Sequence, residues 1–311
     1  MPTTVLQVQE LTKRYGSLTA VRDLSLEIHE GEVFGLLGPN GAGKTTSINM
    51  MCGLLRPDAG RVVIHGQTVT DGDPAVRARV GVCPQNVVLW GQLTCLEQMQ
   101  FVGELYGLRG RAARQRGEKL LEDLDLVEKR DRLARTLSGG MQRRLNLALA
   151  LVHDPDILVL DEPEAGLDPQ SRVRVREYIK SLARRKTVIL TTHNMDEADR
   201  MSDRVAIIDR GQLLTVDTPE ALKRTVGEGD VLEIELEAGS SERAVRAVAS
   251  IVPGASAADH TLVIRARGAV ERLPAILEAL HGADARPGEV RLRANTLEDV
   301  FISLTGRRLR E

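Results

Sequence analysis

The chain has 311 residues, of which 42% are hydrophobic and 28% are charged, and its formal net charge is −2. These values are typical of a soluble globular protein with one large or two ordinary domains, and the balanced charge gives no overall electrostatic reason to expect nucleic acid or anionic lipid as a partner. The three cysteines, Cys52, Cys83 and Cys95, have no metal-ligand spacing, so we interpret them as buried or incidental thiols in a reducing compartment.

The first ten residues lack the basic and then apolar pattern of a signal peptide. No uninterrupted apolar run approaches the roughly 18 residues that a helix needs to cross a bilayer. We therefore expect a cytoplasmic protein, in which any role at a membrane is carried by a partner.

Short apolar runs alternate with turn residues in the first part of the chain. Val5–Glu10 and Ala20–Ile28 have strand-like patterns, and the run Glu32–Leu37 suits a buried strand that ends in a glycine-rich turn. A helical pattern then begins at Gly43 and continues to about Leu54.

The middle of the chain, from about residue 87 to residue 145, has helical periodicity and many charges, which indicates a solvated helical subdomain. Ile157–Leu160 and Thr187–Leu190 follow it as short apolar runs typical of central parallel strands. Strands that alternate with helices predict an α/β core.

The composition changes near Thr225–Asp230, an acidic segment with two glycines, where we place the boundary between a domain of residues 1–226 and a domain of residues 227–311. We expect a small α/β domain beyond it, with strands and helices in alternation. The expected elements are strand 231–237, helix 241–252, strand 261–267, helix 270–281, strand 289–294 and helix 296–305.

Residues 38–45 (GPNGAGKT) fit the phosphate-loop pattern G-x-x-x-x-G-K-[ST], between a predicted strand and a predicted helix. The glycines let backbone amides approach phosphates, and the helix N-terminus adds partial positive charge. Lys44 is expected to reach the β- and γ-phosphates, and the Thr45 hydroxyl to bind Mg²⁺. The predicted ATP-binding residues of this loop are Gly38, Asn40, Gly41, Ala42, Gly43, Lys44, Thr45 and Thr46.

Two acids, Asp161 and Glu162, directly follow the apolar run Ile157–Leu160. A strand that is buried on both faces delivers its last side chains to the carboxyl edge of the sheet, where such folds bind ligands. Asp161 is suited to hold Mg²⁺, and Glu162 to face the attacking water as a general base. Many strands end in acidic loops, so the two acids alone are only a weak indication of a site. Together with the phosphate loop upstream, they are a strong one.

Residues 137–144 (LSGGMQRR) resemble the signature motif of the ATP-binding-cassette (ABC) ATPases. The other motifs of that family follow in its usual order, and the resemblance covers residues 4 to about 225. These motifs are the strand and acids of 157–162, the segment 162–169 (EPEAGLDP), the segment 191–193 (TTH), a glutamine of the Q-loop at Gln85, and an adenine-stacking aromatic at Tyr15.

The resemblance implies a P-loop NTPase fold of the ABC type and a head-to-tail dimer. Ser138 and the amides of Gly139 and Gly140 would clamp the γ-phosphate of ATP on the opposite subunit. His193 would donate to the γ-phosphate, and Asp168 would couple the two sites.

The resemblance also implies catalytic roles for Glu162 and Gln85, and a Mg²⁺ site formed by Thr45, Gln85 and Asp161. Glu164 departs from the family pattern, because a small polar residue is more usual at this position, and it would add charge beside the dimer interface.

The segment 296–307 (TLEDVFISLTGR) is similar to the end of the ATPases of daunorubicin-type antibiotic resistance and sodium efflux. In that group the ATPase is separate from its membrane subunit. We therefore expect a motor for an exporter, peripheral at the inner face of the cell membrane, with a polytopic permease and a second copy or a paralogous ATPase as partners. The C-terminal domain is interpreted as a packing and dimer-stabilising domain, with a ligand sensor as the alternative.

Three other functions stay open on the sequence. An importer motor would share the cassette, and a soluble ABC ATPase acting on nucleic acid or ribosomes would usually carry two cassettes or long insertions. A non-catalytic regulator would lack Glu162 or His193, and both are present. Trp90, the sole tryptophan, lies after Gln85 in a segment expected to face transporter helices; we favour a core position for it, with an exposed anchor as the alternative.

Overall fold

The computed structural model describes residues 3–69, 74–226, 230–237, 239–258, 260–266 and 268–306. The chain divides between Pro219 and Glu220 into two compact units, and each is described by itself. The boundary predicted between residues 226 and 227 adjoins a segment that lies outside the described residues. Residue 267 of the strand predicted over 261–267 and Arg307 of the C-terminal motif also lie outside them.

A six-stranded sheet forms the centre of the first unit. Five of its strands run parallel to one another. The edge strand β10, which comes last along the chain, is antiparallel to its neighbour β9. In spatial order the strands are β10 (Gln212–Asp217), β9 (Arg204–Asp209), β3 (Val33–Leu37), β8 (Thr187–Thr192), β7 (Ile157–Asp161) and β6 (Val80–Cys83). Every residue of β3, β7 and β8 is buried, which confirms the three apolar runs as central strands.

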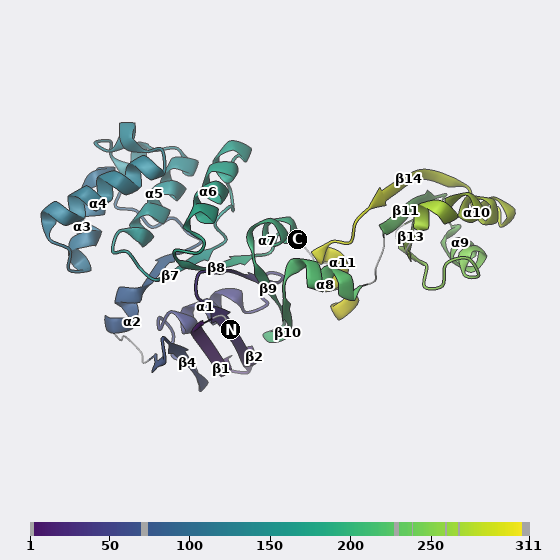
Figure 1. Cartoon of the computed structure of the whole chain (residues 1–311), viewed down its shortest axis with the longest axis horizontal. Coiled ribbons are helices and arrows are strands. Elements are labelled where there is room, and N and C mark those ends of the chain that lie inside the picture. Colours follow the sequence, from purple (N-terminus) through teal and green to yellow (C-terminus); the bar gives the residue numbers. More distant parts are fainter. Residues whose placement is uncertain are drawn as a thin grey trace. The chain divides into compact units, whose positions relative to one another are not determined.

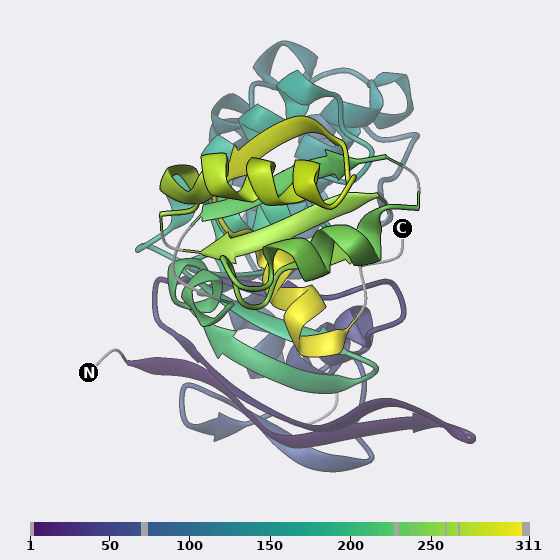
Figure 2. The same cartoon turned by 90° about the vertical axis from the view of Figure 1, so that its right-hand side faces the viewer.

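A second, antiparallel sheet contains the two long N-terminal strands (Figure 2). Its spatial order is β2 (Leu18–His29), β1 (Thr4–Tyr15), β4 (Ala59–Ile64) and β5 (Gln67–Thr68). Its buried side chains pack with those of β3 and of α1 (Lys44–Met51) in one apolar cluster. Helix α1 is shorter than the prediction, because Gly43 and Gly53 lie in the left-handed region with φ of 99° and 66°.

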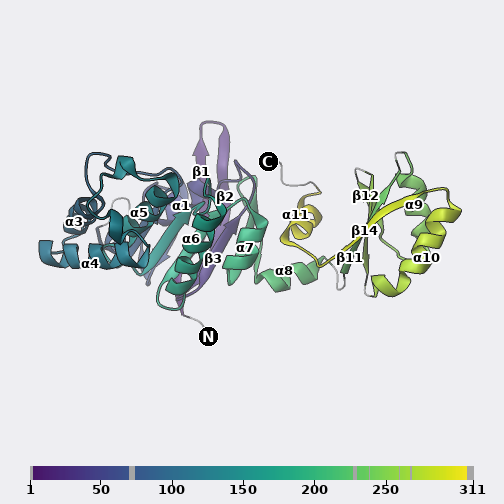
Figure 3. The ribbon, with the colours of Figure 1, turned by 90° about the horizontal axis from the view of Figure 1, so that it is seen from above.

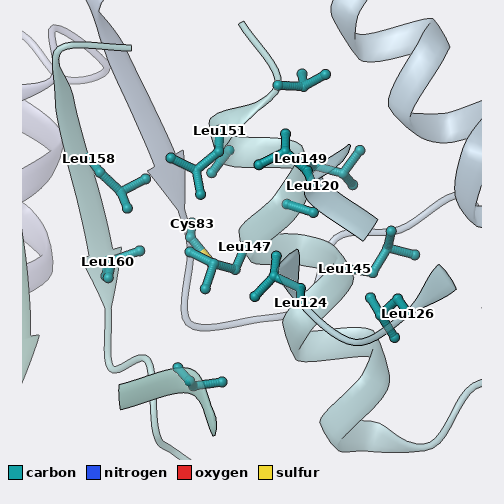
Figure 4. Close-up of a cluster of buried hydrophobic side chains, with 14 of the residues drawn as sticks. Cys83, Leu120, Leu124, Leu126, Leu145, Leu147, Leu149, Leu151, Leu158 and Leu160 are labelled. Atoms are coloured by element: carbon teal, nitrogen blue, oxygen red, sulfur yellow. The ribbon is translucent and has the colours of Figure 1, made fainter. Parts of the chain in front are cut away.

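Three helices gather at one end of the first unit (Figure 1), namely α3 (Cys95–Leu105), α4 (Gly110–Asp123) and α5 (Gly139–Leu151). Helix α3 begins with a capping box between Thr94 and Glu97. Leucines of α4 and α5 pack against the face of β7 that carries Leu158 and Leu160 (Figure 4). These helices lie in the segment of about residues 87–145 that was predicted to be helical, and the last of them continues to Leu151.

Further helices and turns complete the first unit, and no helix within the described residues has the length and apolarity that a membrane span requires. These elements are α2 (Pro74–Arg79), the 3₁₀ turns at Val127–Lys129 and Ala134–Thr136, α6 (Pro169–Leu182), α7 (Met195–Met201) and, across the division, α8 (Pro219–Thr225).

The three cysteines are free and buried, which confirms the interpretation of buried thiols. Burial raises the pKa of the Cys52 thiol to about 12, and the pKa of Cys83 and of Cys95 to about 11. Trp90 is different, because its side chain is 43% exposed, and its ring packs edge-to-face on Phe101 with ring centroids 5.3 Å apart. The preference for a core position was therefore wrong.

The second unit is a four-stranded antiparallel sheet with two helices, α9 (Ser241–Val248) and α10 (Ala269–Gly282), on one face (Figure 3). The strand order is β12 (Ser256–Ala258), β13 (Thr261–Ala266), β11 (Asp230–Leu236) and β14 (Pro287–Arg293), and α11 (Leu297–Thr305) follows β14. All six predicted elements are present. The short strand β12 was not predicted, because three residues are too few to form a periodic pattern.

Candidate active site

The phosphate loop connects β3 to α1 and surrounds a buried lysine. The Lys44 Nζ atom donates hydrogen bonds to the carbonyl oxygens of Gly38 at 2.7 Å and Pro39 at 3.1 Å. Burial lowers the pKa of Lys44, although the nearby charges of Glu162 and Asp161 oppose this effect. Gly43 is required for packing as well as for its positive φ, since a Cβ atom there would lie 2.5 Å from the Ala20 carbonyl oxygen. The loop thus places a desolvated cation at a helix N-terminus, which is an arrangement that binds anions.

A pocket of about 590 Å³ lies over this loop. It brings together nine of the predicted site residues, and Tyr15 contributes a ring that is 51% exposed and available for stacking. The predicted residues that line it are Tyr15, Asn40, Gly41, Gly43, Lys44, Thr45, Thr46, Gln85 and Glu162. Leu18, Thr19, Ala20 and Arg210 also line the pocket, and the sequence motifs gave no signal for them. The Gly38 carbonyl accepts from Lys44 instead, and the Ala42 side chain is buried.

Asp161 ends β7 and accepts hydrogen bonds from two hydroxyls. Thr45 Oγ1 donates to its Oδ2 atom at 3.2 Å, and Thr191 Oγ1 donates to its Oδ1 atom. Thr191 was not predicted as a site residue; it lies opposite Asp161 in the parallel register of β7 and β8, which only the sheet order reveals. The predicted donors Thr45, Asp161 and Gln85 offer hydroxyl, carboxylate and amide oxygens, a hard donor set that fits Mg²⁺.

Glu162 is the centre of the polar cluster in this pocket. Its carboxylate accepts from Gln85 Nε2 at 3.2 Å, lies 2.8 Å from His193 Nδ1, and is 3.9 Å from the Lys44 ammonium. The residue is 6% exposed, and its φ of 49° is in the left-handed region that few residues other than glycine adopt. Three other segments of the chain therefore bring a side chain to this one carboxylate.

Ser138, Gly139, Gly140 and Asp168 do not line this pocket. Ser138 is the N-cap of α5 and accepts from Met141 N at 3.4 Å, while Asp168 is the N-cap of α6 and accepts from Ser171 N at 3.0 Å. The two caps are neighbours, because a Cβ atom on Gly140 would lie 3.5 Å from Asp168 Oδ2. Ser138, Gly139 and Asp168 are exposed, so these residues form a second polar site on the surface of the first unit.

Glu164 lies two residues beyond the Glu162 carboxylate and is paired within the unit. It accepts two hydrogen bonds from Arg176 of α6, at 2.8 Å from Nε and at 2.7 Å from Nη2. The charge of Glu164, which was expected beside an interface, is therefore buried and neutralised by a bidentate ion pair with Arg176. The planar guanidinium matches the two oxygens of a carboxylate in such a pair.

Glu197 of α7 is a further buried acid near the site, and burial raises its pKa from 4.5 to about 7. The hydrogen bond from Thr192 Oγ1 opposes this shift. Between pH 4.5 and 7 the unfolded chain loses this proton while the folded chain keeps it, so this group lowers stability as the pH rises through that window. The Glu197→Gln variant cannot titrate, and we expect it to lack this pH-dependent loss, which is on the order of 3 kcal/mol.

Urea denaturation of the wild type and the variant at pH 5 and pH 8 measures this difference, with the exposed Glu177→Gln as the control. Parallel pH dependences for the wild type and Glu197→Gln would contradict the raised pKa.

Comparisons with known proteins agree with this geometry. The family model described as an ABC transporter matches residues 21–165. The Nod factor export ATP-binding protein I of Ralstonia nicotianae is 42% identical, over 99% of this chain and 96% of its own length. The daunorubicin resistance ATP-binding protein DrrA2 of Streptomyces coeruleorubidus is 40% identical over 97% of this chain and 95% of its own. The linearmycin resistance ATP-binding protein LnrL of Bacillus subtilis is 34% identical over 99% and 100%.

Solved structures give the same family for the first unit. An ATP-binding subunit of an ABC transporter superposes with a TM-score of 0.65 at 27% identity, covering 71% of this chain and 92% of that one. A dimeric ATP-binding cassette bound to ADP and Pi superposes with a TM-score of 0.63 at 27% identity, covering 68% of this chain and 98% of that one. The chain therefore belongs to the ABC transporter family, as an ATP-binding subunit that hydrolyses ATP coupled to transport.

Proposed function

We propose that this subunit powers an exporter of drugs or of other small molecules or ions, through a separate membrane permease. The observation that carries the hydrolytic part is the Glu162 carboxylate, held by Gln85, His193 and Lys44 at the phosphate loop. The export direction is supported by relatives that match over nearly the whole chain and are named for Nod factor export and for daunorubicin or linearmycin resistance.

In the proposed reaction, the Tyr15 ring stacks on adenine while Lys44 and the loop amides bind the phosphates. Mg²⁺, which Thr45, Asp161 and Gln85 would hold, neutralises phosphate charge when bound. Glu162 accepts the proton of the water that attacks the γ-phosphorus, while the bond from this phosphorus to the β–γ bridging oxygen breaks and ADP leaves. His193 keeps Glu162 oriented and donates toward the γ-phosphate.

The second polar site at Ser138, Gly139, Gly140 and Asp168 serves a neighbouring ATPase in this proposal. Ser138, Gly139 and Asp168 are exposed, and all four residues lie outside their own ATP pocket. The anion-binding helix N-terminus is therefore available to an ATP held by another copy or by a paralogous subunit. The dimeric cassette solved with ADP and Pi is a precedent for pairing.

The permease contact is proposed at the exposed apolar side chains of the helical subdomain. These residues follow the Q-loop glutamine along the chain and lie in the loop after it, on α3 and at the C-cap of α3. A permease seated there would sense the site through Gln85. The exposed apolar residues of this segment are Val87, Val88, Trp90, Phe101, Leu105 and Tyr106. The subunit would then work at the cytoplasmic face of the cell membrane.

Purification of tagged Glu162→Gln with MgATP from its native host tests the assignment. We expect a polytopic membrane protein without its own cassette to co-purify, with no external binding protein. Recovery of an external binding protein with the complex would favour an importer motor. Recovery with ribosomes or DNA from the soluble fraction would overturn the transport role and leave the ATPase chemistry standing.

We propose that the C-terminal domain stabilises assembly with the membrane subunit. Its last helix is anchored by Asp299, which accepts from Arg265 at 2.7 Å and from Arg293 at 2.6 Å. Deletion from Asp230 onward removes this sheet with its own apolar core and is expected to reduce the amount of permease that co-purifies. Unchanged co-purification and ATPase activity in the deletion variant would refute this role.

A further inference from the structure

Arg143 is a buried arginine in the second turn of α5, with only 4% of its surface exposed. Arginine has five N–H donors, and a buried guanidinium is costly unless all of them are paired. Here all five are used, and each hydrogen bond ends on a different backbone carbonyl oxygen. No carboxylate forms an ion pair with Arg143 among the described residues.

Two segments supply the five carbonyls. Nη1 donates to Pro84 at 2.6 Å and to Gln85 at 2.8 Å, which belong to the loop after β6. Nη2 donates to Asp161 at 2.7 Å and to Glu162 at 2.8 Å, and Nε donates to Pro163 at 3.3 Å. One side chain thus ties the backbone that carries the Gln85 amide to the backbone that carries both site carboxylates.

The Glu162 backbone requires such support. Its φ of 49° is a left-handed conformation that costs of order 1 kcal/mol or more for a residue with a side chain. Such a conformation persists when the surrounding structure over-determines it. Arg143 bonds the carbonyls on both sides of this residue as well as its own.

We propose that Arg143 is a positioning residue for ATP hydrolysis, which holds the Glu162 and Gln85 backbones in the geometry that their side chains need. The inference rests on the roles proposed above for these two residues. It also joins the two polar sites, because Arg143 lies on the helix whose N-cap is Ser138. A neighbouring subunit that moves this helix would also move the carbonyls at the hydrolytic carboxylate.

Arg144 provides a matched control on the same helix. It is 5% exposed, and its Nη1 atom donates to the carbonyl oxygens of Leu124 at 2.7 Å and Asp125 at 3.1 Å, after α4. It is therefore as buried as Arg143 and also bonds backbone carbonyls, although it adds an ion pair with the Asp125 carboxylate at 3.4 Å, and none of its bonds reaches the site.

The experiment compares ATPase kinetics and thermal unfolding of Arg143→Gln, Arg143→Lys and Arg144→Gln. We expect both Arg143 variants to lose about 100-fold in kcat with KM for ATP within about threefold, since displacement of a catalytic group by 1 Å has an effect of that size. Lysine has three donors in place of five and no planar fork, so Arg143→Lys keeps the charge and the fold without the geometry. If Arg143→Gln does not fold, Arg143→Lys carries the test.

Arg144→Gln is expected to lower the unfolding temperature and to keep kcat within about threefold of the wild type. Equal losses of kcat in the Arg143 and Arg144 variants, or a folded Arg143 variant with wild-type kcat, would overturn the positioning role. Glu162→Gln is measured in the same experiment. If Glu162→Gln retains turnover, Glu162 is not the base. A loss of kcat in the Arg143 variants would then not arise from a displaced Glu162.

Discussion

The Glu162→Gln variant is expected to lose about 1000-fold in ATP turnover while it keeps its affinity for ATP, which is within the range that general-base catalysis contributes. Glutamine has nearly the same shape and can still bond to Gln85 and His193, but it cannot accept a proton from water. ATP then stays intact between two subunits, so a stable dimer should form. Phosphate release and size-exclusion chromatography with MgATP measure the two effects.

Glu177→Gln is the control for this experiment, because Glu177 is an exposed glutamate of α6. It should retain wild-type turnover and should not trap a dimer. Near-normal turnover in Glu162→Gln would remove Glu162 as the base. If Glu162→Gln hydrolysed ATP slowly but stayed monomeric with ATP, the role of Glu162 as the base would stand. The dimer proposed through Ser138 would not be supported.

The Lys44→Met variant is expected to bind ATP about 100-fold more weakly, because charge-assisted hydrogen bonds to phosphate contribute about 1.5–3 kcal/mol each. Burial lowers the pKa of Lys44, so the charged side chain carries a desolvation cost in the protein without nucleotide, which its hydrogen bonds to the Gly38 and Pro39 carbonyls offset. Its removal should therefore change the unfolding temperature of that form little. Calorimetric titration with ATP and thermal unfolding with and without ATP measure both effects.

Lys186→Met is the matched control, since Lys186 is largely buried and also bonds a carbonyl, that of Pro155, at 2.6 Å. It lies outside the ATP pocket and should leave ATP affinity unchanged. If Lys44→Met bound ATP with wild-type affinity, the phosphate-loop assignment would be wrong. If it unfolded without nucleotide, the loss of binding would say nothing specific about phosphate.

The parts of the site that the sequence predicts are those in which the chemistry lies within a few adjacent residues. The loop 38–45 carries its glycines, lysine and threonine together, and Asp161 and Glu162 end one apolar strand. Such local patterns are enough to identify the elements and their order along the chain. The pocket is lined by both Tyr15 and Gln85, which are far apart in the chain.

The features that escaped prediction depend on contacts between distant segments. Thr191 reaches Asp161 only because β7 and β8 are neighbours, and the bonds of Arg143 cross from α5 to two loops. The pairing of Glu164 with Arg176 likewise joins a loop to a helix, so the sequence showed an unusual acid without its partner. Trp90 was misplaced for a related reason, since composition does not show whether a further layer covers a loop.

The buried cysteines make the protein convenient for site-directed labelling. Maleimide dyes and spin labels react with the thiolate, and a thiol whose pKa is about 11 has roughly one thiolate in 10⁴ at pH 7. An engineered cysteine at an exposed position such as Leu105 would therefore be modified selectively with all three native thiols in place. Fluorescence or electron-resonance distances between two labelled subunits could then follow opening and closing through the ATP cycle.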